Sequence, residues 1–175
     1  MTAAASASSL VGRARDGDDR AFEELIRPLL PRALGAALLV TGQLADAEDA
    51  TQDALLEAWR DVGTVRRPDA FAAWFRRLVM RAAVRRAVRR RKERHDGLAV
   101  FDTTAASEPF EQAVWFRLAF SALSPDDRSV VVARYYLGYT TAETSELLAI
   151  PAGTVKSRLH YALGRLRVAG TGGEE

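Results

Sequence analysis

Hydrophobic positions along this chain recur mainly at helical spacing, and few segments alternate with the period of two that is typical of a strand. Phe22, Leu25 and Ile26 start the pattern, which continues past interruptions at Pro28 and Pro31 to Val40. Further helices are predicted over residues 44–60, 69–94, 110–123, 125–137, 140–148 and 152–167. The chain is therefore expected to be all-α.

Residues 140–167 predict two short helices with a tight connection. Thr140 and Glu143 have the spacing of a capping box, and Pro151 suits the first turn of the second helix. That second helix has an apolar face of Val155, Leu159, Ala162, Leu163 and Leu166. Its other faces carry small, polar and cationic residues, namely Lys156, Ser157, Arg158, His160, Tyr161, Gly164 and Arg165. Such a helix suits a DNA major groove. A helical hairpin with an ordinary solvated face is the alternative.

The predicted helix over residues 44–60 carries an acidic stripe. Asp46, Asp49, Asp53 and Glu57 lie within roughly 80° of one another at ~100° per residue. Like charges at this spacing repel, at a cost on the order of 0.2–0.5 kcal/mol per pair. The stripe indicates either a basic partner or a face kept soluble by acids.

Charge is strongly segregated in a chain whose net charge is only +2. Ten Arg or Lys residues and one acid, Glu93, lie between Arg76 and Arg94, so this segment sums to +9 and the remainder to −7. The first half of this helix has an apolar face, which ends after Ala83. Its last turns are therefore expected to project from the core as a cationic stem that binds a polyanion in a salt-dependent manner. A solvated helix end is the alternative.

Breaks in the pattern predict two small helical domains joined by a flexible linker, the second domain being a helix-turn-helix. Residues 1–15 are expected to be disordered, residues 16–94 to form the first domain, 95–108 the linker, 109–168 the second domain and 169–175 a tail. Residues 129–137 locally favour a strand. Ser124 and Pro125 before them and Gly138 after them indicate a helix instead.

Several kinds of chemistry have no support in the composition. There is no Cys, there are only two His residues, and there is no glycine-rich phosphate loop. No apolar run approaches the ~18 residues needed to span a bilayer, and the N-terminus lacks the apolar block of a signal peptide. The chain is expected to be a cytoplasmic protein and not an enzyme, with no catalytic residues, cofactor, metal, small-molecule substrate or membrane insertion.

Two motifs in this order resemble the extracytoplasmic-function (ECF) sigma factors of bacterial RNA polymerase, within the sigma-70 superfamily. Residues 46–59, DAEDATQDALLEAW, resemble the polymerase-binding helix of that family, and residues 123–167 resemble its −35-binding domain. The resemblance implies a sigma factor that binds core RNA polymerase and directs promoter recognition and transcription initiation. It also raises an anti-sigma factor as a further partner.

The resemblance assigns roles to particular residues. Asp46, Glu48, Asp49, Gln52 and Asp53 would bind polymerase. The loop over residues 61–70 and the following helix would hold the −10 element, with DNA contacts from Trp74, Arg77, Arg81, Arg85, Arg86 and Arg89. The −35 element would be faced by Lys156, Ser157, His160 and Tyr161, and Arg158 and Arg165 would contact its phosphates. The family often has Asn and Asp where Arg81 and Arg85 stand, and Arg in place of Tyr161.

Other functions remain open at this point. A stand-alone helix-turn-helix regulator would share residues 140–167 but would give no reason for the acidic stripe. A helical adaptor that binds only proteins would need no DNA contact. A helical enzyme lacks the paired carboxylates, metal cluster or nucleotide loop that it would require.

Overall fold

A computed structural model describes residues 2–93 and 120–171 of the chain, with side-chain environments described from residue 8 to residue 168. Within these residues all regular structure is helical, as the sequence predicts. The first domain contains α1 (Thr2–Arg15), α2 (Asp19–Ile26), α3 (Leu30–Thr41), α4 (Leu44–Asp61), two 3₁₀ turns, η1 (Val62–Thr64) and η2 (Pro68–Ala70), and α5 (Phe71–Glu93). The second contains α7 (Pro125–Val131), the π-helical turn η3 (Val132–Tyr136), α8 (Thr141–Leu148) and α9 (Ala152–Thr171).

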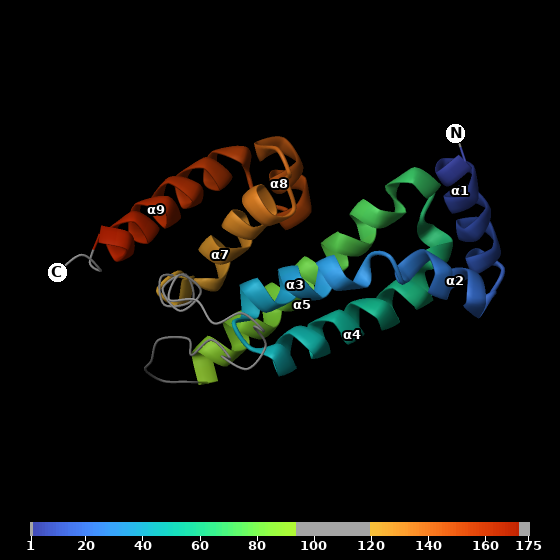
Figure 1. Ribbon diagram of the computed structural model, residues 1–175, viewed down its shortest axis with the longest axis horizontal. Coiled ribbons are helices and arrows are strands. Elements are labelled where there is room, and N and C mark those ends of the chain that lie inside the picture. Colours follow the sequence, from blue (N-terminus) through green and yellow to red (C-terminus); the bar gives the residue numbers. More distant parts are fainter. Residues whose placement is uncertain (1, 94–119, 172–175) are drawn as a thin grey trace.

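Helices α3, α4 and α5 form the body of the first domain, with α1 and α2 at one end (Figure 1). The face of α4 toward this body consists of small side chains, because Ala47, Ala50, Ala54 and Ala58 are all fully buried. Phe75 of α5, also fully buried, supplies bulk to the same core. Small side chains let the helices approach closely, and the larger groups fill the remaining volume.

The helix ends of the first domain follow their local sequence. The side chain of Asp18 accepts the backbone N–H groups of Arg20 and Ala21 at 3.0 and 3.1 Å and so caps α2. Hydrogen bonds from Ala21 and Arg13 lower the pKa of the Asp18 carboxyl. Gly42 closes α3 in the left-handed conformation, at φ 75°. The predicted interruption of this helix near Pro28 and the predicted C-cap at Gly42 are confirmed.

The prediction that residues 1–15 are disordered is wrong for Thr2–Arg15, which form α1. Val11 and Ala14 lie on one side of this helix and are almost completely buried. Helix α1 contacts α2 and both 3₁₀ turns, and Arg13 forms an ion pair with Asp18. Two buried side chains at helical spacing, supported by one ion pair, are enough to hold a segment that is otherwise poor in bulky apolar residues.

In the second domain, α7 begins as its sequence predicts. The hydroxyl of Ser124 accepts the backbone N–H of Asp127 at 3.1 Å, and Pro125 stands at the first helical position. Residues 129–136 are helical despite their β-branched and aromatic side chains, so the prediction of a helix over the strand-favouring segment is confirmed. The last turn widens into a π-helix, in which the N–H of Leu137 donates to the carbonyl of Val132 at 2.9 Å.

Helices α8 and α9 form the predicted helix-turn-helix. Thr140 and Glu143 make both hydrogen bonds of a capping box: the N–H of Glu143 donates to the Thr140 hydroxyl at 3.2 Å, and the N–H of Thr140 donates to the Glu143 carboxylate at 2.7 Å. The hydrogen bond from the backbone of Thr140 lowers the pKa of the Glu143 carboxyl. Ala149 ends α8 in the left-handed conformation, at φ 54°. An L residue there carries backbone strain that glycine would not.

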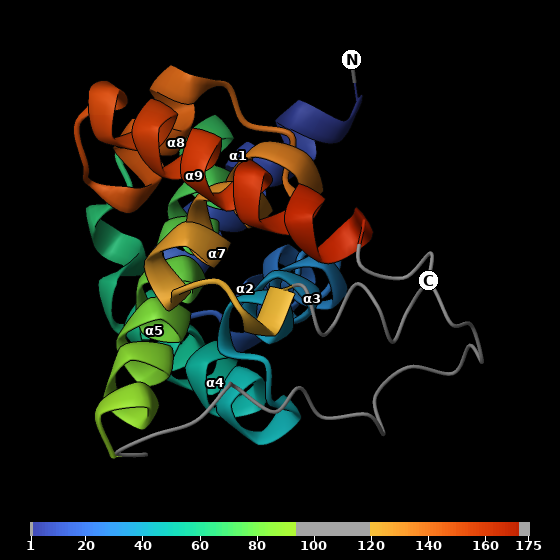
Figure 2. The ribbon, with the colours of Figure 1, turned by 90° about the vertical axis from the view of Figure 1, so that its left-hand side faces the viewer.

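The two domains contact each other. Helices α7 and η3 pack on α3, and α7 and α8 pack on α5, while α9 lies on the outer side of the second domain (Figures 1 and 2). The predicted linker, residues 95–108, and most of the helix predicted over 110–123 lie outside the described residues.

Replacement of Ala149 by Gly is expected to stabilise the second domain by about 0.5–1 kcal/mol, because it relieves the left-handed strain. The matched variant Ala142→Gly removes a methyl group from an exposed helical position of α8 and is expected to cost about 0.5–1 kcal/mol. Urea unfolding followed by circular dichroism measures both. Destabilisation by both variants would contradict the strain at Ala149.

Candidate polymerase and nucleic-acid interfaces

The acidic stripe of α4 is paired inside the protein with the arginine-rich end of α5. Arg86 donates from its two terminal nitrogens to Asp49 at 2.7 Å and to Asp53 at 2.9 Å. Arg90 donates to Asp46 at 2.6 Å. Burial opposes the charged form of Arg86, but its hydrogen bond to Asp53 and the surrounding carboxylates leave its pKa raised overall.

These pairs correct the expectation that the last turns of α5 project freely. Asp46, near the start of α4, pairs with Arg90, whereas Asp49 and Asp53, further along α4, pair with Arg86, which comes earlier in α5. This reversed order is the register of two antiparallel helices. Ala87 between the two arginines is buried, so α5 stays in contact with α4. The end of α5 therefore packs on α4 along one side, where its arginines are paired with acids, and its other side carries exposed arginines.

The remaining predicted polymerase contacts lie on the solvent side of α4. Glu48 and Gln52, one helical turn apart, are both exposed. Leu56, one further turn along the same face, is 49% exposed. Sequence analysis missed Leu56, although its spacing of four residues from Gln52 marks the same face. The exposed surface of α4 is thus acidic and polar with one apolar contact point.

On α5 the predicted DNA contacts divide between two faces. At ~100° per residue, Trp74, Arg77, Arg81, Arg85 and Arg89 lie within roughly 120° of one another. Arg81, Arg85 and Arg89 are exposed, and Trp74 and Arg77 are half-buried. Arg86 points to α4 instead, where it forms ion pairs with Asp49 and Asp53. The five others form what we call the α5 strip.

The loop before α5 is held at both ends. Val62 and Val65 are buried, and the Thr64 hydroxyl donates to the carbonyl of Asp61 at 2.7 Å. Arg67 pairs with Asp69 at 2.6 Å, and this pair raises the pKa of Arg67 and lowers that of Asp69. The polar part of the loop is thus presented to solvent next to the start of the α5 strip.

Helix α9 exposes the residues that the sequence assigned to DNA. Val155 and Ala162 are fully buried, whereas Lys156, Ser157, His160, Tyr161 and Arg165 are exposed. Tyr161 is 55% exposed, and its hydroxyl accepts a hydrogen bond from Arg165 at 3.2 Å. The guanidinium of Arg165 also lies 5.7 Å from the centre of the Tyr161 ring. We call this exposed set the α9 face.

Arg158 does not belong to the α9 face. Its guanidinium lies 3.3 Å from the carboxylate of Asp126 on α7, and only 31% of its side chain is exposed. The pair ties the second helix of the helix-turn-helix to α7. The structure therefore gives Arg158 a carboxylate partner within the protein.

No group of three or more metal-ligating side chains occurs within the described residues. Over the same ranges, no helix combines the length and apolarity needed to cross a bilayer. The solvent side of α4, the α5 strip and the α9 face consist mainly of charged and polar groups on helices, which suits binding to a macromolecule.

Comparison with known proteins covers both domains. The family model of sigma-70 region 2 matches residues 25–94, and that of sigma-70 region 4 matches residues 119–168. The ECF RNA polymerase sigma factor SigM of Mycobacterium tuberculosis is 36% identical over 156 residues, which cover 86% of this chain and 77% of the relative. The RNA polymerase sigma-E factor of Streptomyces coelicolor is 31% identical over 153 residues, with 86% of each chain covered.

Two solved structures share the fold. The sigma factor RpoE of Bartonella quintana, in complex with the anti-sigma factor NepR, has a TM-score of 0.69 at 23% identity, over 86% of this chain and 96% of that one. CnrH, in complex with the cytosolic domain of CnrY, has a TM-score of 0.71 at 20% identity, over 97% and 99%. The two region matches and the identity to SigM together show that the chain belongs to the ECF class of sigma-70 family RNA polymerase sigma factors.

Proposed function

We propose how this sigma factor divides its two tasks, core polymerase binding and promoter recognition, among its surfaces. The solvent side of α4, with Glu48 and Gln52 at its centre, binds core polymerase. The α5 strip and the loop over residues 62–70 hold the −10 element as single strand, and the α9 face reads the −35 element in the major groove. The first domain would thus carry the polymerase contact and the −10 contact, and the second domain the −35 contact.

The observation that carries this proposal is the division of the α5 arginines between two faces. Arg86 and Arg90 neutralise the acids of α4, which leaves the α5 strip as the cationic surface available to a polyanion. Trp74 within the strip adds an aromatic ring on which an unstacked base can lie. We omit Arg86 and Arg158 from the proposed DNA contacts because both have carboxylate partners inside the protein.

Polymerase contact through α4 is consistent with the same geometry. Asp49 and Asp53 serve both as partners of Arg86 and as part of the acidic field around Glu48. Arg86 and Arg90 reduce the mutual repulsion of these acids, so α4 keeps a negative face without the full cost of like charges.

Further properties follow as part of the proposal. A protein that joins RNA polymerase works in the cytoplasm, and it acts by binding rather than by catalysis. An anti-sigma factor is a further proposed partner, supported by the likeness to RpoE, which is bound by NepR. A stand-alone regulator is less well supported, because it would need no region 2 domain.

The α5 strip predicts a salt dependence that the opposite face of the helix does not share. Each phosphate contact contributes about 0.7–0.9 to the slope of log K against log salt, so Arg85→Gln with Arg89→Gln should flatten the slope by about 1.5. The matched pair Arg86→Gln with Arg90→Gln removes the same charge from the α4 side and should leave the slope unchanged. Promoter binding by the holoenzyme, titrated with salt, compares the two. Equal slopes in the two double variants would refute the assignment.

Charge reversal on α4 tests the polymerase contact without breaking the ion pairs of Arg86. Glu48→Lys should weaken the affinity for core polymerase at least about tenfold, because it places like charge against a basic partner. Glu24→Lys, on an exposed position of α2, makes the same change in net charge and should have no effect. Fluorescence titration with core polymerase measures both affinities. If both variants bind like the wild type, α4 is not the contact.

A further inference from the structure

A tyrosine and an arginine on the exposed side of α9 are joined by two contacts. Arg165, one helical turn after Tyr161, donates from Nη1 to the Tyr161 hydroxyl at 3.2 Å, and its guanidinium lies 5.7 Å from the centre of the ring. The hydrogen bond and the cation–π contact restrain the ring, although 55% of Tyr161 is exposed. The side chain is thereby oriented before any ligand binds, which lowers the entropy lost on binding.

The hydrogen bond from Arg165 also decides what the Tyr161 hydroxyl offers to a ligand. A phenol has one O–H proton, and it donates that proton more strongly when its oxygen already accepts a hydrogen bond. Arginine has no acceptor atom, so the proton cannot be donated back to Arg165. The Tyr161 hydroxyl therefore acts as a hydrogen-bond donor on the α9 face.

A glycine leaves space open next to this ring. At ~100° per residue, Gly164 lies in the middle of the α9 face, about 40° from His160 and about 60° from Tyr161. Apart from its chain neighbours and the adjacent backbone of the helix, no atom lies within 4 Å of a Cβ placed at Gly164. A residue without a side chain lets a ligand approach the helix backbone closely.

The space at Gly164 is part of a hollow of about 500 Å³. Its lining consists of Ala122, His160, Tyr161, Gly164, Arg165 and Val168. Ala122 and Val168 contribute methyl groups, and Val168 is 74% exposed. The hollow thus places an apolar surface next to the aromatic ring and the hydroxyl donor of Tyr161.

One base presents the matching pair of groups in the major groove. Thymine carries the O4 acceptor beside its C5-methyl group. Guanine and adenine offer acceptors but no methyl group, and cytosine offers an amino donor where thymine has O4. A hydroxyl donor beside an apolar hollow therefore fits thymine better than the other three bases.

Tyr161 also has the length that its place on α9 requires. It lies nine residues after Ala152, where α9 begins, which is about 13.5 Å along the helix axis. Recognition helices contact bases chiefly through their N-terminal residues. A base contact from the third turn needs a long side chain, and tyrosine supplies one with only two side-chain torsions to restrict.

We propose that Tyr161, held by Arg165 and open to the hollow at Gly164, selects thymine at one position of the −35 element. The Tyr161 hydroxyl donates to O4, and its ring and the hollow receive the C5-methyl group. Arg165 is a positioning residue, because it acts on the base through Tyr161. The thymine contact rests on the proposed binding of the −35 element by the α9 face and adds the base that this face prefers.

Three pyrimidines separate the two parts of the contact. Uracil keeps the O4 acceptor but lacks the methyl group, and 5-methylcytosine keeps the methyl group but has an amino donor in place of O4. Holoenzyme binding to promoters with a randomised −35 element identifies the thymine position, and synthetic promoters then carry each base there, paired with its complement. For the wild type, uracil should weaken binding about fourfold, for one methyl group, and 5-methylcytosine at least about fivefold, for one hydrogen bond.

Variants of Tyr161 assign each preference to its chemical group. Tyr161→Phe should keep the preference for thymine over uracil and lose the hydroxyl's part of the preference over 5-methylcytosine, whereas Tyr161→Ala should lose both preferences. Arg165→Met removes the donor that orients Tyr161 and should reduce the ratio of thymine to 5-methylcytosine affinity at least about twofold. An equal loss of affinity for all three bases would instead contradict the positioning role of Arg165.

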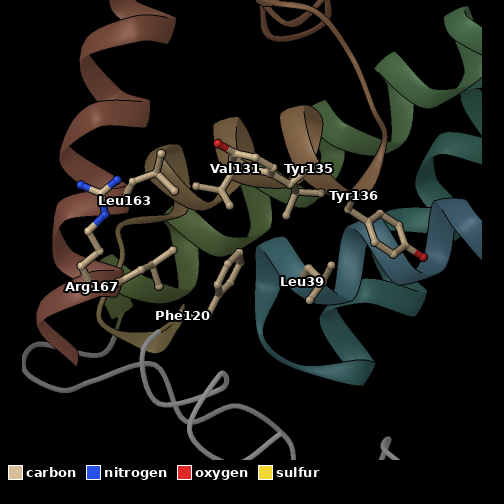
Figure 3. A pocket seen from close by; sticks show the side chains of 9 residues that line it. Leu39, Phe120, Val131, Tyr135, Tyr136, Leu163 and Arg167 are labelled. Atoms are coloured by element: carbon tan, nitrogen blue, oxygen red, sulfur yellow. The ribbon is translucent and has the colours of Figure 1, made fainter. Parts of the chain in front are cut away.

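Tyr135 provides the matched control, since it is a second exposed tyrosine, at 63%, on another surface. Figure 3 shows Tyr135 in a groove that it lines together with Leu163 and Leu166 of α9. At ~100° per residue these leucines lie roughly 140–160° around the helix from Tyr161. Tyr135→Phe should therefore leave the relative affinities for the three bases unchanged.

Two results would overturn the thymine contact. One is a selected library without a thymine position in the −35 element, and the other is the same ranking of the three bases for Tyr161→Ala as for the wild type. Lys156→Gln, on the same face, should weaken binding to all three promoters through one lost charge. If Lys156→Gln and Tyr161→Ala both bind every promoter like the wild type, the α9 face does not contact the −35 element and the proposed function itself fails.

Discussion

Close antiparallel packing of α4 on α5 is the interaction on which the rest of this structure depends. Small buried side chains on α4, including Ala50 and Ala54, allow the two helices to approach, and the approach brings Asp49 and Asp53 within reach of Arg86. Each exposed ion pair is worth at most about 1 kcal/mol. Their larger effect is to fix which side of α5 is neutralised and which stays cationic.

The two sides of α5 would have different roles in the function that we propose. The neutralised side, around Arg86 and Arg90, joins α5 to the helix that we assign to polymerase. The α5 strip on the other side remains free of the α4 acids and lies beside the loop over residues 62–70. In the function we propose, polymerase contact and single-strand contact therefore lie on two helices of the first domain that pack on each other, and the helix-turn-helix supplies a further DNA contact.

Much of the fold could be predicted from the sequence because its signals are local. Three predicted helix ends depend only on neighbouring backbone groups, and the structure confirms them. They are the capping box of Thr140 and Glu143, the helix start at Ser124 and Pro125, and the helix end at Gly42. Long-range contacts were not predicted. The partners Asp46 and Arg90 are 44 residues apart, and only the antiparallel register brings them together. The helix over residues 2–15 is not predicted, because Val11 and Ala14 alone supply too little apolar periodicity to indicate it.

The residues exposed on the proposed interfaces could largely be predicted from the sequence, but the ion pairs that some of them form within the protein could not. Helical spacing placed Lys156, His160 and Tyr161 on the exposed side of α9, where the structure has them. The same reasoning did not predict the ion pairs of Arg86 and Arg158, because charge patterns along one helix do not show which cations meet acids on another. The contacts of Tyr136 with Arg32 and of Tyr139 with Arg76 could not be predicted either, since each joins residues that are far apart in the sequence.

The measurement that tests the central claim most directly is a combined footprint of the holoenzyme on a promoter identified by its run-off transcript. A sigma factor that contacts DNA through two separated domains should protect two regions about 25 base pairs apart, roughly 85 Å along the duplex. Permanganate should then modify unpaired thymines in the downstream region only, and only when core polymerase is present. A single protected region, or the same footprint from the chain without polymerase, would contradict this account.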